Sequence, residues 1–256
     1  MRDRCRAKRP KTDLRKEPRE RSPDVVALGG AIEPVRRRIE AACARAGRDP
    51  SSVTLLAVSK GVPIERLRAA LELGQVDFGE NRVQEAEAKA AALPGAQWQL
   101  VGRLQSNKAA RAVAVFDVIH SVDSVQLATR LDRLARTARS APLPVYLEVN
   151  VDADPAKAGF SAAGLGGAMA VLSSLDALEL RGLMTVGRLV QNEADARQTF
   201  AALRHLGDEL RAAHPELGAG LSMGMSADFE TAIEEGATVV RVGSAIFGPR
   251  PIGAAV

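Results

Sequence analysis

The chain has 256 residues and a formal net charge of +4, with 46% hydrophobic residues and only 3% aromatic residues. This length suits one large α/β domain with a full core, and it leaves no space for a second domain of ordinary size. The shortage of aromatic residues argues against a base-stacking nucleic-acid surface, and two cysteines cannot build a disulfide framework or a metal cluster.

The positive charge is concentrated at the start of the chain. Residues 1–24 carry ten Arg and Lys against five Asp and Glu, which leaves a net charge of −1 for the remaining body. We expect a disordered basic tail over 1–24 and a single domain over 25–256, because the tail has almost no apolar residues to bury. Binding of this tail to RNA or to an acidic surface is the alternative to a simple solvated extension. We also expect no secretory signal, no membrane span and a cytoplasmic location.

The body begins with a helical pattern and continues as a repeated alternation. Segment 31–47 predicts a helix, because Ile32, Val35 and Ile39 share one face and Gly47 is typical of a helix end. Eight apolar, strand-like runs then alternate with amphipathic helical stretches, at 53–59, 75–81, 97–102, 116–122, 144–150, 178–186, 220–225 and 238–243. This alternation predicts an α/β fold, a single (β/α)₈ TIM-type barrel with an extra N-terminal helix, rather than an open sheet.

Lys60 stands at the end of the first predicted strand. The carboxyl ends of barrel strands open into one common mouth, where active sites form. A surface lysine is the simpler interpretation of Lys60 taken alone. However, a partly desolvated mouth shared with Arg103 and Arg241 would favour the neutral amine, which is the nucleophile for an aldehyde. We therefore predict that Lys60 is a Schiff-base lysine.

The last two predicted strands both end in Gly and Ser before a helix begins. Capping of the following helix would by itself explain Ser226. After the last strand, Gly243 allows backbone N–H groups to approach a ligand, and Ser244 begins another helical turn. Barrels commonly bind phosphate with the loops after strands 7 and 8. One amine and one phosphate site in the same mouth are what pyridoxal phosphate requires.

Arg241 lies within the last predicted strand, two residues before Gly243. Both positions therefore face the barrel interior. A buried arginine needs an anion or acceptor, and two partners are open: a carboxylate such as Glu80, or a ring nitrogen of the cofactor. Asn81 and Ser106 could be helix caps, and binding roles for Asn81 at the cofactor ring and for Arg103 at an anion are equally open.

Several ordered motifs carry a resemblance to a known family. They include AVSK (57–60), FGEN (78–81), VGRLQSNK (101–108), RGLMT (181–185), LSMGMS (221–226) and VRVG (240–243). From about residue 31 to 248 the chain resembles the pyridoxal phosphate homeostasis protein family, the single-domain relatives of the alanine racemase barrel, known as PLP fold type III. The resemblance implies that Lys60 carries the cofactor as an internal aldimine and that Arg241 faces the pyridine nitrogen. It also implies phosphate contacts from Ser226, Gly243 and Ser244, and ring contacts from Asn81 and Met223.

The family implies a protein that binds pyridoxal 5′-phosphate, takes part in intracellular vitamin B6 homeostasis and has little or no turnover. Delivery of the cofactor to apo-enzymes, and a monomeric state, belong to the same expectation. The alternative is a PLP-dependent amino-acid racemase or related enzyme, which needs a second acid/base group; the only tyrosine, Tyr146, lies in mid-strand and is expected to pack. A third hypothesis is a barrel for another phosphorylated small molecule, with Lys60 as a counter-charge.

Overall fold

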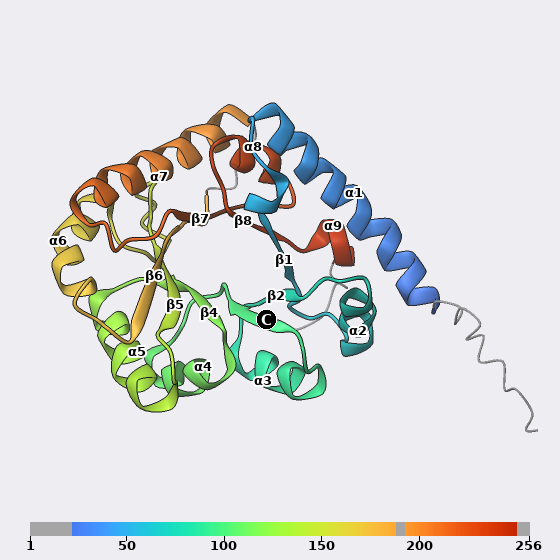
Figure 1. Cartoon of the computed structure of the whole chain (residues 1–256), viewed down its shortest axis with the longest axis horizontal. Coiled ribbons are helices and arrows are strands. Elements are labelled where there is room, and N and C mark those ends of the chain that lie inside the picture. The colour runs from blue at the N-terminus through green and yellow to red at the C-terminus, as the bar shows by residue number, and fades with distance from the viewer. Residues whose placement is uncertain (1–21, 188–192, 250–256) are drawn as a thin grey trace, which may run out of the picture.

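Eight parallel strands close into a barrel in chain order. The computed structural model describes residues 22–187 and 193–249. Figure 1 shows the strands around a central axis, with helices forming an outer ring. The strands are β1 Thr54–Val58, β2 Asp77–Glu80, β3 Gln97–Leu100, β4 Val118–Val122, β5 Leu143–Glu148, β6 Leu178–Met184, β7 Gly220–Met225 and β8 Val239–Val242. Seven lie within the predicted runs and β5 begins one residue before its run, and the predicted (β/α)₈ barrel is confirmed.

Helices surround the barrel (Figure 1). They are α1 Pro23–Arg45, α2 Ile64–Glu72, α3 Val83–Ala92, α4 Ala109–Val115, α5 Val125–Ala138, α6 Ala162–Leu172, α7 Glu193–Ala213, α8 Phe229–Glu234 and α9 Ser244–Phe247. Helices α2 to α8 connect successive strands, α1 precedes β1 and α9 follows β8. Two short 3-10 helices, η1 Pro50–Ser52 and η2 Ser106–Lys108, lie in the connections before β1 and α4. No described helix has the length and apolar character needed to cross a membrane.

Helix α1 begins earlier than the sequence pattern predicts. Ser22 caps it by accepting a hydrogen bond from the Val25 amide, and Pro23 occupies the first turn, where proline is favoured. The buried stripe also starts earlier, with Val25 and Leu28. The predicted boundary of the tail at residue 24 is therefore wrong, since residues 23–24 are helical. The rest of the predicted disordered tail, 1–21, lies outside the described residues.

Two glycines, Gly29 and Gly30, interrupt the apolar pattern of α1 and account for the missed start. At Gly29 the helix passes close to Leu73, which would lie 3.7 Å from a Cβ there. Helix α1 contacts α2, α8 and α9 (Figure 1). Helices α8 and α9 span only six and four residues, which is too short to cover the outer face of β8 and β1. Helix α1 completes the helical layer there.

The barrel interior is partly polar, whereas the layer between the strands and the helices is apolar. Val240 and Val242 of β8 belong to the large apolar cluster under the helices, so Val239 and Arg241 face inward. A small apolar cluster fills part of the interior and contains Leu56, Tyr146, Met184 and Val239. The remaining interior is polar, and a buried arginine there needs the acceptors described below.

A close approach between β6 and β7 depends on a single glycine. Gly182 has φ +145°, and a Cβ at this position would lie 1.9 Å from the carbonyl oxygen of Gly220. We expect Gly182→Ala to lower the free energy of unfolding by more than about 3 kcal/mol, because the backbone pairing must separate. Urea unfolding of the purified variant measures this loss.

The control is Gly167→Ala, on the exposed side of α6, where a Cβ meets nothing within 4 Å. This change should stabilise the protein by about 0.5–1 kcal/mol, since alanine favours a helix. Wild-type stability of the Gly182 variant would contradict the described packing of β6 against β7.

Candidate functional site

A cavity of about 620 Å³ lies at the carboxyl ends of the strands. It includes six of the seven predicted site residues, namely Lys60, Asn81, Ser226, Arg241, Gly243 and Ser244. They come from the ends of β1, β2, β7 and β8, which the barrel brings to one edge. A volume of this size is typical of a site for a small organic ligand.

Lys60 lies in a tight turn directly after β1. The Val62 amide donates to the Ser59 carbonyl at 3.0 Å, which closes the turn. Gly61, the third residue of the turn, has φ +71°. A turn with a positive φ at its third residue favours glycine at that position. The chain therefore reverses direction at Lys60, and this residue forms part of the cavity wall.

The loops after β7 and β8 are joined by one hydrogen bond. The Gly243 amide donates to Ser226 Oγ at 3.3 Å. Capping of the next helix, the simpler explanation of Ser226, is excluded because Asp228 is the residue at the N-cap of α8. Asp228 instead accepts a hydrogen bond from the Met225 amide at 2.6 Å. Ser226 is thereby available to connect the two loops at which a phosphate was predicted.

Arg241 is buried beside the cavity, with only 5% of its surface exposed. It donates from Nη1 to the Ser222 carbonyl at 2.6 Å and to Ser222 Oγ at 2.9 Å, and from Nη2 to the Thr185 carbonyl at 2.7 Å. Burial lowers the pKa of Arg241 to about 10, against the opposing effect of the Asp228 and Glu148 carboxylates. Arg241 therefore remains a cation at neutral pH.

Glu80 is not the partner of Arg241. Its Oε1 accepts from Ser59 Oγ at 2.6 Å and from Lys89 Nζ at 2.7 Å. Of the two partners that the sequence left open for Arg241, Glu80 is therefore excluded. Glu80 shares a strand face with Phe78, which belongs to the core under the helices, so it faces α3 and meets Lys89 there rather than Arg241 inside the barrel.

A neutral hydrogen-bonded chain supports Arg241 inside the barrel. Ser222 Oγ lies 2.8 Å from His120 Nδ1, and His120 Nε2 lies 2.8 Å from Gln99 Oε1. Because Gln99 donates its amide N–H to Asp77 at 2.8 Å, its oxygen accepts from His120 Nε2. Burial, reinforced by Arg241, lowers the pKa of His120 to about 3. His120 is therefore neutral, and Arg241 retains the charge.

Met223, the seventh predicted residue, lies elsewhere. It has no exposed surface and belongs to the core under the helices. Ser222 faces inward to contact Arg241, so the next residue along the strand faces outward. The pairing of β7 is irregular between Ser222 and Met225, and Gly224 has φ +88°. This irregularity brings Met225, rather than Met223, to the cavity wall.

Among the lining residues that the sequence analysis did not propose are Arg66 of α2 and Phe247 of α9. Arg66 donates to the Phe247 carbonyl at 2.7 Å, which connects the two helices over the site. Neither carries a sequence signal, because the direction of each depends on how its helix packs. With Arg66, the cavity has three cationic side chains, and its described lining contains no carboxylate.

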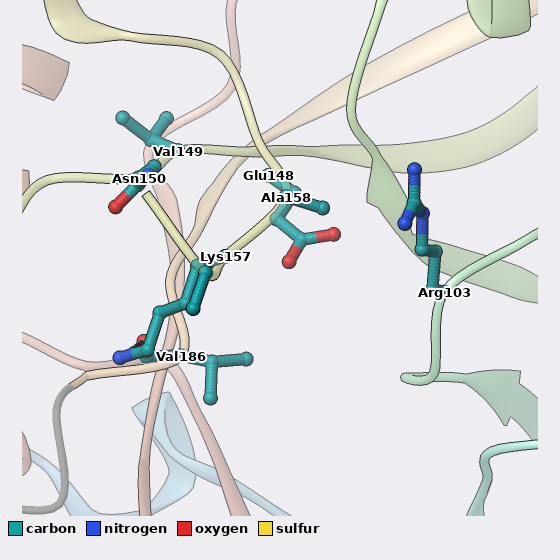
Figure 2. Close-up of a pocket in the computed structure, with 8 residues that line it drawn as sticks. Arg103, Glu148, Val149, Asn150, Lys157, Ala158 and Val186 are labelled. Carbon is teal, nitrogen blue, oxygen red and sulfur yellow. Dashed lines mark hydrogen bonds between the residues drawn. The ribbon is translucent and has the colours of Figure 1, made fainter. Parts of the chain in front are cut away.

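A smaller cavity of about 240 Å³ adjoins the first, and Val186 lines both. Figure 2 shows Glu148 between Lys157 and Arg103 in this second cavity. Lys157 Nζ donates to the Val186 carbonyl at 3.0 Å, and Arg103 lies 3.7 Å from Asp123. Arg103 is therefore part of the neighbouring cavity rather than of the one that contains Lys60.

Comparison with known proteins places the chain among barrels of one class. Residues 33–251 match the family described as alanine racemase, N-terminal domain. An alanine racemase of Clostridium difficile superposes with a TM-score of 0.69 over 90% of this chain and 59% of its own, at 14% identity. At that identity the likeness concerns the fold alone. Fold and match together define a barrel of the alanine racemase class, PLP fold type III.

Curated relatives identify a narrower family within this class. A pyridoxal phosphate homeostasis protein of Pseudomonas aeruginosa is 43% identical over 87% of this chain and 96% of its own length. The protein of the same name from Escherichia coli is 39% identical over 84% and 94%. PipY of Synechococcus elongatus, solved with PLP bound, superposes with a TM-score of 0.77 at 42% identity, covering 86% of this chain and all of its own. The chain belongs to the pyridoxal phosphate homeostasis protein family.

Glu148 gives the second cavity a measurable pH response. Burial, followed by repulsion from Asp123, raises the pKa of Glu148 to about 7 from its ordinary value near 4.5. Between these two pH values the folded state therefore holds a proton on Glu148 that the unfolded state releases. The stability that wild type gains from this proton is fully present below pH 4.5 and is lost as pH rises through 7. Glutamine at this position carries no titrating group. The free energy of unfolding of Glu148→Gln, minus that of wild type, should therefore rise by on the order of 1 kcal/mol from pH 5 to pH 8.

Urea unfolding of both proteins at pH 5 and pH 8 measures this change. The relevant quantity is the difference between variant and wild type at each pH, since other groups titrate equally in both. A difference that is the same at the two values would show that Glu148 is ionised throughout this range.

Proposed function

We propose that this chain binds pyridoxal 5′-phosphate in the cavity of about 620 Å³ and takes part in vitamin B6 homeostasis. The observation that carries the proposal is the lining of the cavity: one lysine at a strand end, further cations and no carboxylate among the described residues. Such a lining suits a ligand with a phosphate group. The names of the curated relatives and the PLP-bound PipY structure support the same cofactor.

The residues of this cavity match the chemical parts of the cofactor. When bound, PLP supplies an aldehyde that condenses with a primary amine, with loss of one water molecule. We assign the amine to Lys60, which lines the same cavity as the loops of Ser226 and Gly243. These loops, with Ser244, would hold the phosphate through hydroxyl and backbone N–H groups. Asn81 and Met225 would contact the ring.

Arg241 would determine the electronic character of the bound ring. A guanidinium group can only donate hydrogen bonds, so a pyridine nitrogen beside it accepts and stays unprotonated. Ser222 and Thr185 already hold this guanidinium in place. An unprotonated ring withdraws electrons less strongly, which disfavours chemistry on a bound amino acid. This argues for a protein that retains and releases the cofactor rather than one that turns over a substrate.

The position of Tyr146 supports the same conclusion. Its ring stacks on His120, with centroids 4.5 Å apart, inside the barrel. It lines a separate cavity with Thr54 and Asp77, which begin β1 and β2, so it faces the amino end of the barrel. Tyr146 is thus unsuited to act as the second acid/base group of a racemase at the Lys60 cavity. Apo-enzymes that need PLP are the recipients that such a carrier would serve.

The central test is covalent attachment of PLP at Lys60. Protein incubated with PLP should show a band near ~420 nm, and borohydride reduction followed by peptide mass spectrometry should find the cofactor on Lys60. Lys60→Ala should remove the label from this position, whereas Lys108→Ala, outside the cavity, should leave it unchanged. If wild type and Lys60→Ala both give the spectrum of free PLP, the cavity binds another phosphorylated molecule.

Amino-acid turnover separates the carrier from the enzyme. We expect no interconversion of L- and D-alanine by the PLP-loaded protein, because a racemase needs a positioned proton-transfer group on each face, each typically contributing about 10²–10⁴-fold. Chiral chromatography after prolonged incubation measures the product. Racemisation that is lost in Lys60→Ala but not in Lys108→Ala would establish the enzymatic alternative.

A further inference from the structure

Lys89 of α3 is a buried lysine outside the candidate cavity. Only 8% of its surface is exposed. Its Nζ donates to the Ser59 carbonyl, to Glu80 Oε1 and to Glu85 Oε1, each at 2.7 Å. Three short contacts satisfy all the donors of an ammonium group. One side chain therefore connects the end of β1, the end of β2 and the first turn of α3.

The contacts of Lys89 and Glu85 enclose the backbone of Lys60. The peptide group before Lys60 is held at its carbonyl, that of Ser59, by Lys89. The peptide group after Lys60 is held at its N–H, that of Gly61, which donates to Glu85 Oε1 at 2.6 Å. The orientations of these two peptide groups set φ and ψ of the residue between them. The direction in which the Lys60 side chain leaves the backbone is therefore fixed from α3.

The same group of contacts reaches the next wall of the cavity. Glu80, which has no exposed surface, directly precedes Asn81 and bonds to both Ser59 and Lys89. Burial raises the pKa of Glu80, and Lys89 opposes this effect. Its second oxygen, Oε2, has no hydrogen-bond partner in the structure. Loss of Lys89 would leave this carboxyl with Ser59 as its remaining partner.

Burying these charges is costly, and stability alone is a poor reason for it. A buried ion pair is often no more stabilising than apolar residues of the same volume, whereas it does impose one geometry. The side chain of Glu85, 28% exposed, forms the outer end of the group. The contacts converge on the two peptide groups beside the one lysine of the cavity, which is where a fixed geometry matters.

We propose that Lys89, acting through Glu85 and the Ser59 carbonyl, is a positioning residue that holds the Lys60 turn in the orientation needed for reaction with an aldehyde. This inference deepens the proposed function and rests on it. Lys89 itself does not line the cavity. Its effect passes through the backbone of residues 59–61.

The first measurement needs no cofactor. The Gly61 amide is at an exposed position, so its hydrogen bond to Glu85 is the source of its protection from solvent exchange. Glu85→Ala removes this acceptor from a partly exposed site, where the fold should tolerate the change. We expect the Gly61 amide to exchange about 10–100-fold faster in Glu85→Ala, as measured by NMR, because a bond to a charged acceptor is lost.

The second measurement is the rate at which PLP becomes attached to Lys60, followed by borohydride trapping and mass spectrometry. Glu85→Ala and Lys89→Met should both attach PLP at least about tenfold more slowly than wild type, because the amine is no longer held in one direction. Glu87→Ala is the matched control: Glu87 lies on the same helix and bonds to Arg111 of α4, away from the turn. It should match wild type in both measurements.

The outcomes separate the two proposals. Wild-type rates of Gly61 exchange and of Lys60 attachment in Glu85→Ala would overturn the positioning role, and this variant decides the matter if Lys89→Met fails to fold. If wild-type protein attaches no PLP at Lys60, the proposed function is wrong. In that case the Gly61 exchange rate in Glu85→Ala still decides whether this group of contacts holds the turn.

Discussion

The pairing of β1 with β8 closes the barrel, and the candidate site depends on this closure. The register aligns Leu56 with Arg241 and Ala57 with Val242, so Lys60 and Gly243 emerge at the same edge although most of the domain separates them in sequence. Beyond the last pair, the two strands stay close: a Cβ on Gly243 would lie 3.3 Å from the Val58 carbonyl oxygen. A glycine at this point lets the loop after β8 pass beside the end of β1.

Two separate sets of contacts hold the neighbouring strands β8 and β1 at the cavity. Arg241 is held from inside the barrel, by Ser222 and by the chain of neutral groups that continues to His120. Lys60 is held from outside the barrel, by α3 through Lys89. In both cases oxygen acceptors offset the cost of burying a cation: three for the Lys89 ammonium and three for the Arg241 guanidinium. The polar interior thus gives up some apolar packing in exchange for fixed positions at the mouth.

The same construction bears on the choice between carrier and enzyme. A positioned amine and a cationic cavity lining would suit the capture of an aldehyde that carries a phosphate. Beside a pyridine nitrogen, as we propose, Arg241 would disfavour the electron withdrawal that amino-acid chemistry requires. Tyr146, at the amino end of the barrel, is used in packing against His120. Retention of the cofactor and turnover of a substrate make different demands, and the described residues meet the first of them.

Several features of this protein follow from the sequence alone. The alternation of apolar runs and helical stretches predicts the barrel, because strands buried on both faces need such runs and each parallel pair needs a crossover helix. The inward position of Arg241 follows from the two-residue period of a strand. The position of Lys60 at the mouth follows from its place at a strand end. All of these are local properties that neighbouring residues determine.

Other features were decided only by the tertiary structure. The irregular pairing of β7 exchanges Met225 for Met223 at the cavity. The meeting of two loops gives Ser226 an amide partner in place of a helix cap. The packing of α3 assigns Glu80 to Lys89 rather than to Arg241. Each outcome depends on the distance between segments remote in sequence, and local periodicity carries no information about that distance.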